Sequence, residues 1–399
     1  MSSITDLEFT VSDQTKFPSR KNIEGPSPFW DKYTEGPSYI KPEDRQKPLV
    51  PSGKLDQKYS AFATDLSPLL GTTYDDNVKL TDILDNDELL KDLAIKISQR
   101  GVVVFKHQKD LTIPQQKELI QKLGILSGKP KGNGLHIHPS APGAGIIGEN
   151  GLVDPELSFI TNRKKSKVFA QKYEEKTAAW GWHSDITFEP VPADYSSLRI
   201  FELPPTGGDT LWANGYALYE KLSPSLRSYF DTLTGTYSQP IFKENANEEY
   251  NLYSEERGAP ENIGDDLKAI QPIVRTNPVT GWKTLFAVGH HFTKINEVNP
   301  LESQALKEFV WNILVQSHDI QVRHKWGKYD IAIWDNRSTY HTANPDIKLL
   351  GDVYRSGVRT VGIAERPYLD PNSITQTEGL QKLSTSENEL ADSLKKVSI

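Results

Sequence analysis

The stretch that decides how this chain folds and acts is Trp180-Gly181-Trp182-His183-Ser184-Asp185-Ile186-Thr187-Phe188. It holds the only His-x-Asp of the sequence. Residues two apart on a strand or its extended continuation point to the same side, so the imidazole of His183 and the carboxylate of Asp185 can share one ion. A third ligand is available in His341, which follows a strand-like apolar run far downstream. Two histidines and one carboxylate on one face of an octahedron leave three positions open, as in non-haem Fe(II) oxygenases.

These three residues alone do not establish a metal site. The chain has nine histidines, so such a pattern can arise by chance, and a lone buried histidine is more often only hydrogen-bonded. Three further motifs follow in order, and each adds chemistry suited to a metal enzyme. They are PPTGGDTLW at 204–212, IWDNR at 333–337, and the arginines Arg355 and Arg359.

Together with WHSDITF at 182–188, these motifs resemble the taurine dioxygenase (TauD) family of 2-oxoglutarate-dependent Fe(II) oxygenases. The resemblance runs from about residue 60 to about residue 367, and several linked motifs in the right order are far more specific than any single one. It implies that His183, Asp185 and His341 bind Fe(II), that 2-oxoglutarate and O2 are cosubstrates, and that the chain is an enzyme that hydroxylates a C–H bond.

The resemblance also assigns residues to the two small molecules. The far carboxylate of 2-oxoglutarate needs a bidentate cation and a hydroxyl donor, because a buried unpaired carboxylate is costly. By resemblance these are Arg355 and Thr210. Arg359, four residues on and hence on the same face of a predicted strand, matches the position that grips the substrate's anionic head. His138, in LHIHP at 135–139, matches a substrate-contacting histidine. The alternatives are a rim salt bridge for the arginines and an unliganded loop histidine for His138.

Composition narrows the class of protein. The chain has 399 residues, no cysteine and a formal net charge of -7. Disulfides and thiolate ligands are therefore excluded, and general nucleic-acid binding, which needs a basic footprint, is disfavoured. No window approaches the roughly eighteen consecutive apolar residues of a membrane span, and the N-terminus lacks a secretory signal pattern. We expect a cytoplasmic enzyme whose partner is a small anionic molecule, with neither nucleic acid nor membrane as partner.

The fold expected from the pattern of elements is mainly β with peripheral helices. Many strands with helices only at the edges imply paired antiparallel sheets, and the resemblance specifies a double-stranded β-helix, or jelly roll. Clear local signals include helices over 86–100 and from Thr112, the buried strand 102–105, and a hairpin around 277–281. A capping box at Asn299 predicts a helix to about Ser317. Four of its residues are expected to face the core, namely Leu306, Phe309, Val310 and Ile313.

We expect one catalytic domain over 58–367 between an extended leader and a polar tail. The leader, 1–57, is rich in proline and carries the apolar residues Phe29, Trp30 and Tyr33. We expect it to lie over the domain or over a partner in a homo-oligomer, and the alternative is a mobile tail. Within the domain, 128–177 reads as a lid and 244–268 as an acidic insertion. The tail, 368–399, is low in core residues.

Three functions remain open from sequence. The leading hypothesis is a dioxygenase acting on a sulfonate such as taurine, or on an alkyl sulfate, in sulfur scavenging. The second keeps the iron chemistry but hydroxylates a free amino acid or another carboxylate. The third is a jelly-roll binding protein without catalysis, against which the intact residues His183, Asp185, His341, Thr210 and Arg355 argue.

Overall fold

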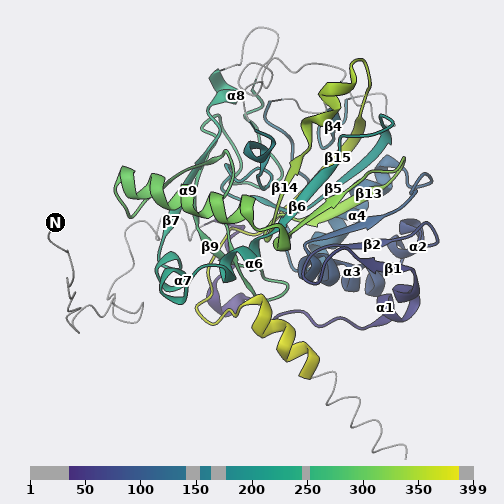
Figure 1. The fold of residues 1–399 in the computed structure, drawn as a ribbon. Helices are drawn as coiled ribbons and strands as arrows, with labels where there is room; N and C mark the ends of the chain where they lie inside the picture. Colours follow the sequence, from purple (N-terminus) through teal and green to yellow (C-terminus); the bar gives the residue numbers. More distant parts are fainter. Residues whose placement is uncertain (1–35, 141–152, 163–176, 245–251, 386–399) are drawn as a thin grey trace, which may run out of the picture. The chain divides into compact units, whose positions relative to one another are not determined.

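A seven-stranded sheet forms the centre of the fold (Figure 1). The computed structural model describes residues 36–140, 153–162, 177–244 and 252–385. Neighbouring strands of this sheet are antiparallel except β2 and β3, which are parallel. In spatial order the strands are β1 (Ala63–Asp65), β2 (Thr72–Tyr74), β3 (Val102–Phe105), β13 (Ile331–Asp335), β5 (Ala193–Glu202), β15 (Ser356–Ile363) and β4 (Ser158–Thr161).

A smaller sheet packs against the inner face of the large one. Its order is β12 (Gln321–His324), β6 (Thr210–Asn214) and β14 (Thr339–Ala343). The ring of Trp212 on β6 lies 5.9 Å from the ring of Trp334 on β13, and both belong to one buried cluster between the sheets. Two antiparallel sheets therefore enclose an apolar core, and the mainly β class expected from sequence is confirmed.

The central strands of the large sheet are buried on both faces. Along β13, Ile331 and Ile333 point to the helices outside, whereas Ala332 and Trp334 point to the small sheet. This follows from the period of two along a strand. It also explains why β13 is apolar at each of its first four positions instead of alternating with polar residues.

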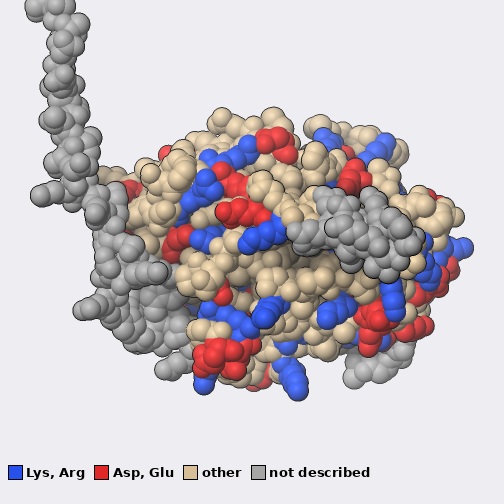
Figure 2. All heavy atoms as spheres, turned by 90° about the horizontal axis from the view of Figure 1, so that it is seen from below, with Lys and Arg blue, Asp and Glu red and all other residues tan. Residues whose placement is uncertain are grey.

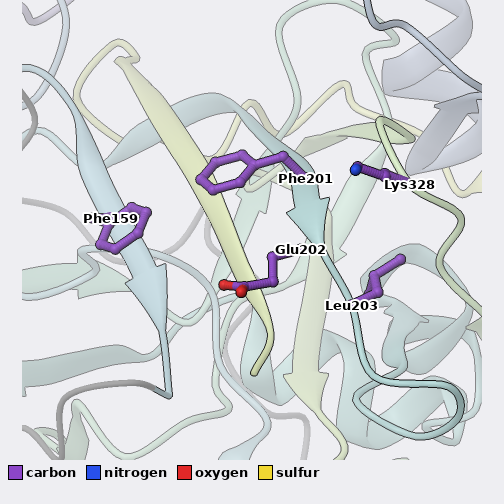
Figure 3. A pocket seen from close by; sticks show the side chains of 5 residues that line it. All are labelled: Phe159, Phe201, Glu202, Leu203 and Lys328. Atoms are coloured by element: carbon purple, nitrogen blue, oxygen red, sulfur yellow. The ribbon is translucent and has the colours of Figure 1, made fainter. Parts of the chain in front are cut away.

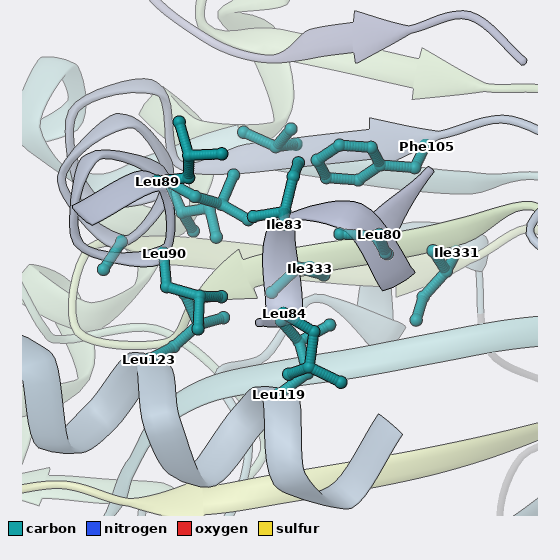
Figure 4. Packing of buried hydrophobic residues seen from close by; sticks show 14 of the residues in the cluster. Leu80, Ile83, Leu84, Leu89, Leu90, Phe105, Leu119, Leu123, Ile331 and Ile333 are labelled. Carbon is teal, nitrogen blue, oxygen red and sulfur yellow. The ribbon is translucent and has the colours of Figure 1, made fainter. Parts of the chain in front are cut away.

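Four helices cover the outer face of the large sheet: α1 (Lys54–Tyr59), α2 (Leu80–Leu84), α3 (Asp87–Arg100) and α4 (Ile113–Leu126). Figure 4 shows Leu119 and Leu123 of α4 beside Leu84 and Leu90, in the same buried cluster as Ile333 of β13. The helices α3 and α4 lie where the sequence predicts them. The carboxamide of Asn86 caps α3, Gly101 ends it at a φ of 72°, and Thr112 and Gln115 form the capping box of α4.

A second apolar cluster lies beyond the small sheet. It is built by α6 (Gly215–Glu220), α7 (Pro224–Phe230), α9 (Pro300–Gln316), β7 (Thr234–Ser238), β9 (Val274–Thr276), β10 (Lys283–Leu285) and β11 (Phe292–Ile295). The strand β8 (Lys268–Pro272) pairs with β7, and Phe242 of α8 (Ile241–Glu244) belongs to a separate cluster with Ile186 and Phe188. The strands β9 and β10 form the predicted hairpin. Short 3-10 turns occupy Pro42–Asp44, Ser60–Phe62, Ala178–Gly181, His318–Ile320 and Pro345–Leu350.

The helix α9 has the expected capping box at Asn299. Of the residues expected on its inward face, Val310 is buried and Leu306 and Ile313 pack partly buried against the same cluster, to which Leu314 also belongs. Phe309 is 41% exposed, so the expectation for this residue is wrong. Residues four apart lie on one face of a helix, and Phe309 sits about 100° away from Val310, which turns its ring toward solvent.

The expected N-terminal and central segments are only partly described. Residues 1–35, which include Phe29, Trp30 and Tyr33, lie outside the described residues, as do 141–152 and 163–176 of the expected lid and 245–251 of the insertion. The rest of the leader is packed: Leu55 is buried, and the amide of Leu49 donates to the carbonyl of Val279 at 2.8 Å. The segment 128–177, expected to be irregular, contributes the edge strand β4.

The segment expected as a polar tail from residue 368 packs against the rest of the protein over its first part. Tyr368 and Leu369 are buried. Residues 376–385 are helical, and the carboxamide of Asn214 donates to the buried Gln376 at 2.9 Å. The polar composition hid this docking, because the contacts come from few, widely spaced residues.

We predict that a chain ending at 367 is less stable than one ending at 385. Loss of the buried Tyr368 and Leu369 costs about 2 kcal/mol each, so the free energy of unfolding should fall by about 4 kcal/mol. Urea denaturation of both truncated chains and the full chain measures this. Equal midpoints for the two truncations would show that residues 368–385 add nothing to stability.

Candidate active site

Two backbone hydrogen bonds bring the distant histidines together. The amide of His183 donates to the carbonyl of His341 at 3.0 Å, and the amide of His341 donates back to His183 at 2.8 Å. His341 lies on β14, which pairs with β6 in the small sheet. The two imidazole rings consequently lie 4.2 Å apart, so the structure places side by side two residues that sequence alone could only connect by motif.

The carboxylate of Asp185 completes the group. Its Oδ1 lies 3.9 Å from Nε2 of His183 and 3.8 Å from Nε2 of His341, and one ligand atom from each residue lies within 4.8 Å of the others. Among the described residues this is the one group of three or more such side chains that could hold a metal ion. His183 Nδ1 hydrogen-bonds the carbonyl of Gly181 at 2.7 Å, which places the proton on Nδ1 and leaves the Nε2 lone pair for a metal.

Residues outside the motif hold Asp185 in place. Its Oδ2 accepts from the hydroxyl of Ser196 at 2.8 Å, and its amide donates to Oδ1 of Asn336 at 3.1 Å. The carboxamide of Asn336 in turn donates to Ser196 at 2.8 Å. The sequence alone indicated no role for Ser196 or Asn336. The available signal was the position of Asn336, directly after the buried strand β13 and inside IWDNR.

The protonation states of the three residues suit a divalent cation. Burial alone would raise the pKa of Asp185, but the charges of Arg359 and the two histidines lower it below its usual value. Burial, together with the charge of His183, lowers the pKa of His341 to about 3. Burial also lowers the pKa of His183. A carboxylate and two neutral imidazoles are the forms in which these side chains bind metals.

Arg355 and Thr210, the two residues expected to bind 2-oxoglutarate, also meet in the structure. Nη2 of Arg355 donates to the hydroxyl oxygen of Thr210 at 3.3 Å, and the indole of Trp326 donates to the same oxygen at 3.0 Å. Gly208, with a φ of 71°, lies so close that a Cβ there would be 2.8 Å from Cδ of Arg355. The Gly-Gly turn of the motif therefore makes room for the arginine as well as the turn.

Arg359 and His138 are the two residues expected to bind the substrate. Nη1 of Arg359 donates to Oδ1 of Asp185 at 2.6 Å, so the structure pairs it with a candidate metal ligand. The ring of His138 is 5.2 Å from that of Phe242, and its Nδ1 is 2.9 Å from the hydroxyl of Ser140. Burial first, then the charges of His136 and Arg359, hold the pKa of His138 well below its usual value.

The pair His290-His291 flanks the site. Gly289, with a φ of 115°, packs so tightly that a Cβ there would be 3.2 Å from Cα of His183. The ring of His290 lies 5.2 Å from that of His183 and is stacked on Trp180 at 5.3 Å. Together with His291, whose ring is 6.4 Å from that of His183, they form an aromatic wall beside this candidate ligand.

A hollow of about 630 Å³ lies elsewhere, at the edge of the large sheet (Figure 3). It is lined by Phe159, Phe201, Glu202, Leu203 and Lys328, none of which is a candidate site residue. Figure 2 shows acidic and basic side chains interspersed over one face of the molecule, without the continuous basic surface that nucleic-acid binding requires. No described helix combines the length and the apolar character needed to cross a membrane.

Residues 63–348 match the family model described as taurine catabolism dioxygenase TauD, TfdA family. The chain belongs to this family. It is 40% identical over 381 residues to an alpha-ketoglutarate-dependent dioxygenase of Penicillium shearii, covering 86% of this chain and 98% of that one. It is 32% identical over 305 residues to an alpha-ketoglutarate-dependent sulfonate dioxygenase of Saccharomyces cerevisiae, covering 76% and 67%.

The fold agrees with this membership. A taurine dioxygenase from Burkholderia xenovorans superposes with a TM-score of 0.58 at 28% identity, covering 78% of this chain and 92% of that one. The jelly roll predicted from the family resemblance is thus confirmed. As a member of this family the chain is a dioxygenase that uses Fe(II), 2-oxoglutarate (alpha-ketoglutarate) and O2.

We predict that Ser196→Ala weakens Co(II) or Fe(II) binding about tenfold, because outer partners of metal ligands typically contribute this much. The variant removes the hydrogen bond to Oδ2 of Asp185. Isothermal titration of the folded apoprotein measures it. Ser197→Ala is the matched control, since Ser197 is the next residue on β5 and contacts Gln116 of α4 instead. Equal affinities in the two variants would refute the supporting role of Ser196.

Proposed function

We propose that the chain hydroxylates a small anionic substrate, a sulfonate such as taurine or an alkyl sulfate, at a site formed by His183, Asp185 and His341. The observation that carries this proposal is the His-Asp-His group, in which Arg359 donates to Asp185, together with the buried Arg355, which lies four residues earlier and donates to Thr210. When bound, Fe(II) with 2-oxoglutarate and O2 supplies the oxidation of a C–H bond to C–OH, with release of succinate and carbon dioxide.

Arg355 is the residue that we assign to the far carboxylate of 2-oxoglutarate. It is buried, and its Nε has no hydrogen-bond partner. The carboxylate whose charge acts on the pKa of Arg355 is that of Asp209, and it is already paired with Nε of Arg323 at 2.7 Å. Burial lowers the pKa of Arg355 to about 10, which still leaves it protonated at neutral pH. A buried cation without a counterion in the described chain calls for an anionic ligand.

Thr210 supports that assignment. Its hydroxyl oxygen accepts from both Arg355 and Trp326, so its own proton is available to a second acceptor. A guanidinium and a hydroxyl converging on one point can donate together to a carboxylate. Thr210 and Arg355 thus orient 2-oxoglutarate, while His183, Asp185 and His341 hold the ion.

Arg359 and His138 are assigned to the substrate's anionic head. Arg359 is the cation that touches Asp185, and its Nε has no partner, so it retains donors for an anion beside the metal ligands. The sulfonate dioxygenase of S. cerevisiae supports a sulfur-containing anion. A carboxylate fits the same guanidinium, so hydroxylation of an amino acid or another carboxylate is the alternative.

The two substrate classes differ in what happens after hydroxylation. A hydroxyl placed on the carbon that bears a sulfonate or sulfate ester gives an adduct that collapses to an aldehyde with release of sulfite or sulfate. A hydroxylated amino acid is stable. We therefore expect succinate formation stimulated by taurine, hexanesulfonate or hexyl sulfate, with sulfite or sulfate released in equal amount. Succinate stimulated only by amino acids, without sulfite or sulfate, would move the function to the alternative.

We predict that two arginine variants separate the two ligand sites. Arg355→Met should raise KM for 2-oxoglutarate about 100-fold, because truncating one partner of a buried charge pair costs about 3 kcal/mol. Arg359→Met should raise KM for the best substrate of that panel by a similar factor and leave the Kd of 2-oxoglutarate within about threefold of wild type. Each variant is the control for the other, and exchanged effects would contradict both assignments.

A further inference from the structure

A buried cluster of Arg257, Glu189 and His136 has no part in the proposed chemistry. Nε and Nη2 of Arg257 donate to the two carboxylate oxygens of Glu189 at 2.5 and 2.9 Å. Nε2 of His136 lies 3.4 Å from the same carboxylate. Burial lowers the pKa of His136, and the pKa of Glu189 stays below its usual value because Arg257 and His136 outweigh burial. A charged bidentate pair with a neutral imidazole is thus locked inside the protein.

Arg257 belongs to residues 252–264, here called the strap. The strap is bound to the segment that carries His138 at two points. The amide of Gly134 donates to the carbonyl of Gly258 at 2.8 Å, and the amide of Tyr253 donates to the carbonyl of Pro139 at 2.9 Å. Gly258 has a φ of 86°, and any Cβ there would collide with the carbonyl of Leu135. The two stretches of backbone therefore run in direct contact on both sides of His136 and His138.

The strap is also bound to the residues that follow Asp185. Asn262 exchanges two hydrogen bonds with the backbone of Val191, at 2.9 and 2.8 Å. The amide of Glu189 donates to the carbonyl of Ile186 at 3.0 Å and closes the turn after Asp185. In that turn Ile186 has a φ of 48°, which is strained for a β-branched residue and persists only where surrounding contacts hold it.

These contacts connect the segment that carries His138 to the turn that follows Asp185, through the cluster of His136, Glu189 and Arg257. His136 is two residues before His138, and Glu189 is four residues after Asp185. The ring of His138 then contacts Phe242, whose ring is 5.9 Å from that of Phe188 in the turn segment. Breaking the cluster would free the strap and the His138 segment from the turn, while the backbone pair of His183 and His341 would remain.

We propose that His136, Glu189 and Arg257 are positioning residues that fix His138 relative to Asp185 and so set the affinity for the hydroxylated substrate. The inference rests on the proposed function, because it assigns the substrate to the His138 side of the site. In the described chain, none of the three residues forms a hydrogen bond or an ion pair with the candidate metal ligands, Thr210 or Arg355. Metal and 2-oxoglutarate binding should therefore not depend on them.

The test must avoid leaving a lone buried charge, which by itself can unfold a protein. The double variant Glu189→Gln/Arg257→Gln removes both charges together and keeps polar groups for the carbonyls of Tyr253 and Gly264, to which Arg257 donates. The matched control is Lys283→Gln/Asp231→Asn. This ion pair, 2.6 Å long and mostly buried, joins β10 to the end of α7 and touches none of the three connected segments.

The probe is whichever of taurine, hexanesulfonate, hexyl sulfate and L-amino acids stimulates most succinate in the wild-type enzyme. In Glu189→Gln/Arg257→Gln we expect KM for this probe to rise at least tenfold and product per succinate to fall, with kcat less affected. The Kd values of Co(II) and 2-oxoglutarate should stay within twofold of wild type. Arg257→Lys keeps the charge but not the bidentate geometry, so its KM for the probe should lie between those of the wild type and the double variant. The control pair should change none of these values.

A double-mutant cycle with His138→Ala separates positioning from general stability. If the cluster acts through His138, adding Glu189→Gln/Arg257→Gln to His138→Ala should not raise KM further. Additive effects, or a wild-type KM and product ratio in the folded double variant, would overturn the inference alone. Absence of stimulated succinate from wild type with every probe would instead overturn the proposed function.

Discussion

The pair of backbone hydrogen bonds between His183 and His341 is the constraint on which the site depends. It joins an isolated extended residue to β14 and so attaches the His-x-Asp turn to the small sheet. Asp185 is held to the large sheet by Ser196 of β5 and by Asn336 after β13. The three candidate ligands therefore come from both layers of the jelly roll, and any change in the spacing of the sheets would move one ligand relative to the others.

Charge is distributed around the site according to what can be neutralised within the protein. Asp335 and Arg337, Arg275 and Glu365, and Glu189 and Arg257 pair internally, so each of these buried charges has an opposite partner. The buried Arg199 instead donates to the backbone carbonyls of Gln108 and Leu111. Arg355 donates to the hydroxyl of Thr210, and no carboxylate of the described chain lies within ion-pair distance of it. A buried guanidinium in these surroundings is suited to an anion from solution.

Sequence could predict what is encoded locally or by an ordered motif. The capping boxes at Thr112 and Asn299 depend on neighbours a few residues apart, and they are found as expected. The ligand set, Thr210 and Arg355 were accessible because several motifs occur in one order. The hydrogen bond from Ser196 to Asp185 joins residues 11 apart, and that from Asn214 to Gln376 joins residues 162 apart. Neither pair shares a sequence pattern, so only the folded chain shows these contacts.

The residues assigned to metal and 2-oxoglutarate and those assigned to the substrate lie on different kinds of structure. Sheets hold the groups assigned to metal and 2-oxoglutarate, since His341, Thr210 and the serine that supports Asp185 lie on β14, β6 and β5. The residues assigned to substrate selection lie mainly on segments without regular hydrogen-bond ladders, 134–140 and the strap, which are free to vary in length and composition. Such segments position a side chain only if something rigid ties them down. In this protein a buried ion pair meets that need, because charge pairing inside a low-dielectric interior is directional and cannot slide as an apolar contact can.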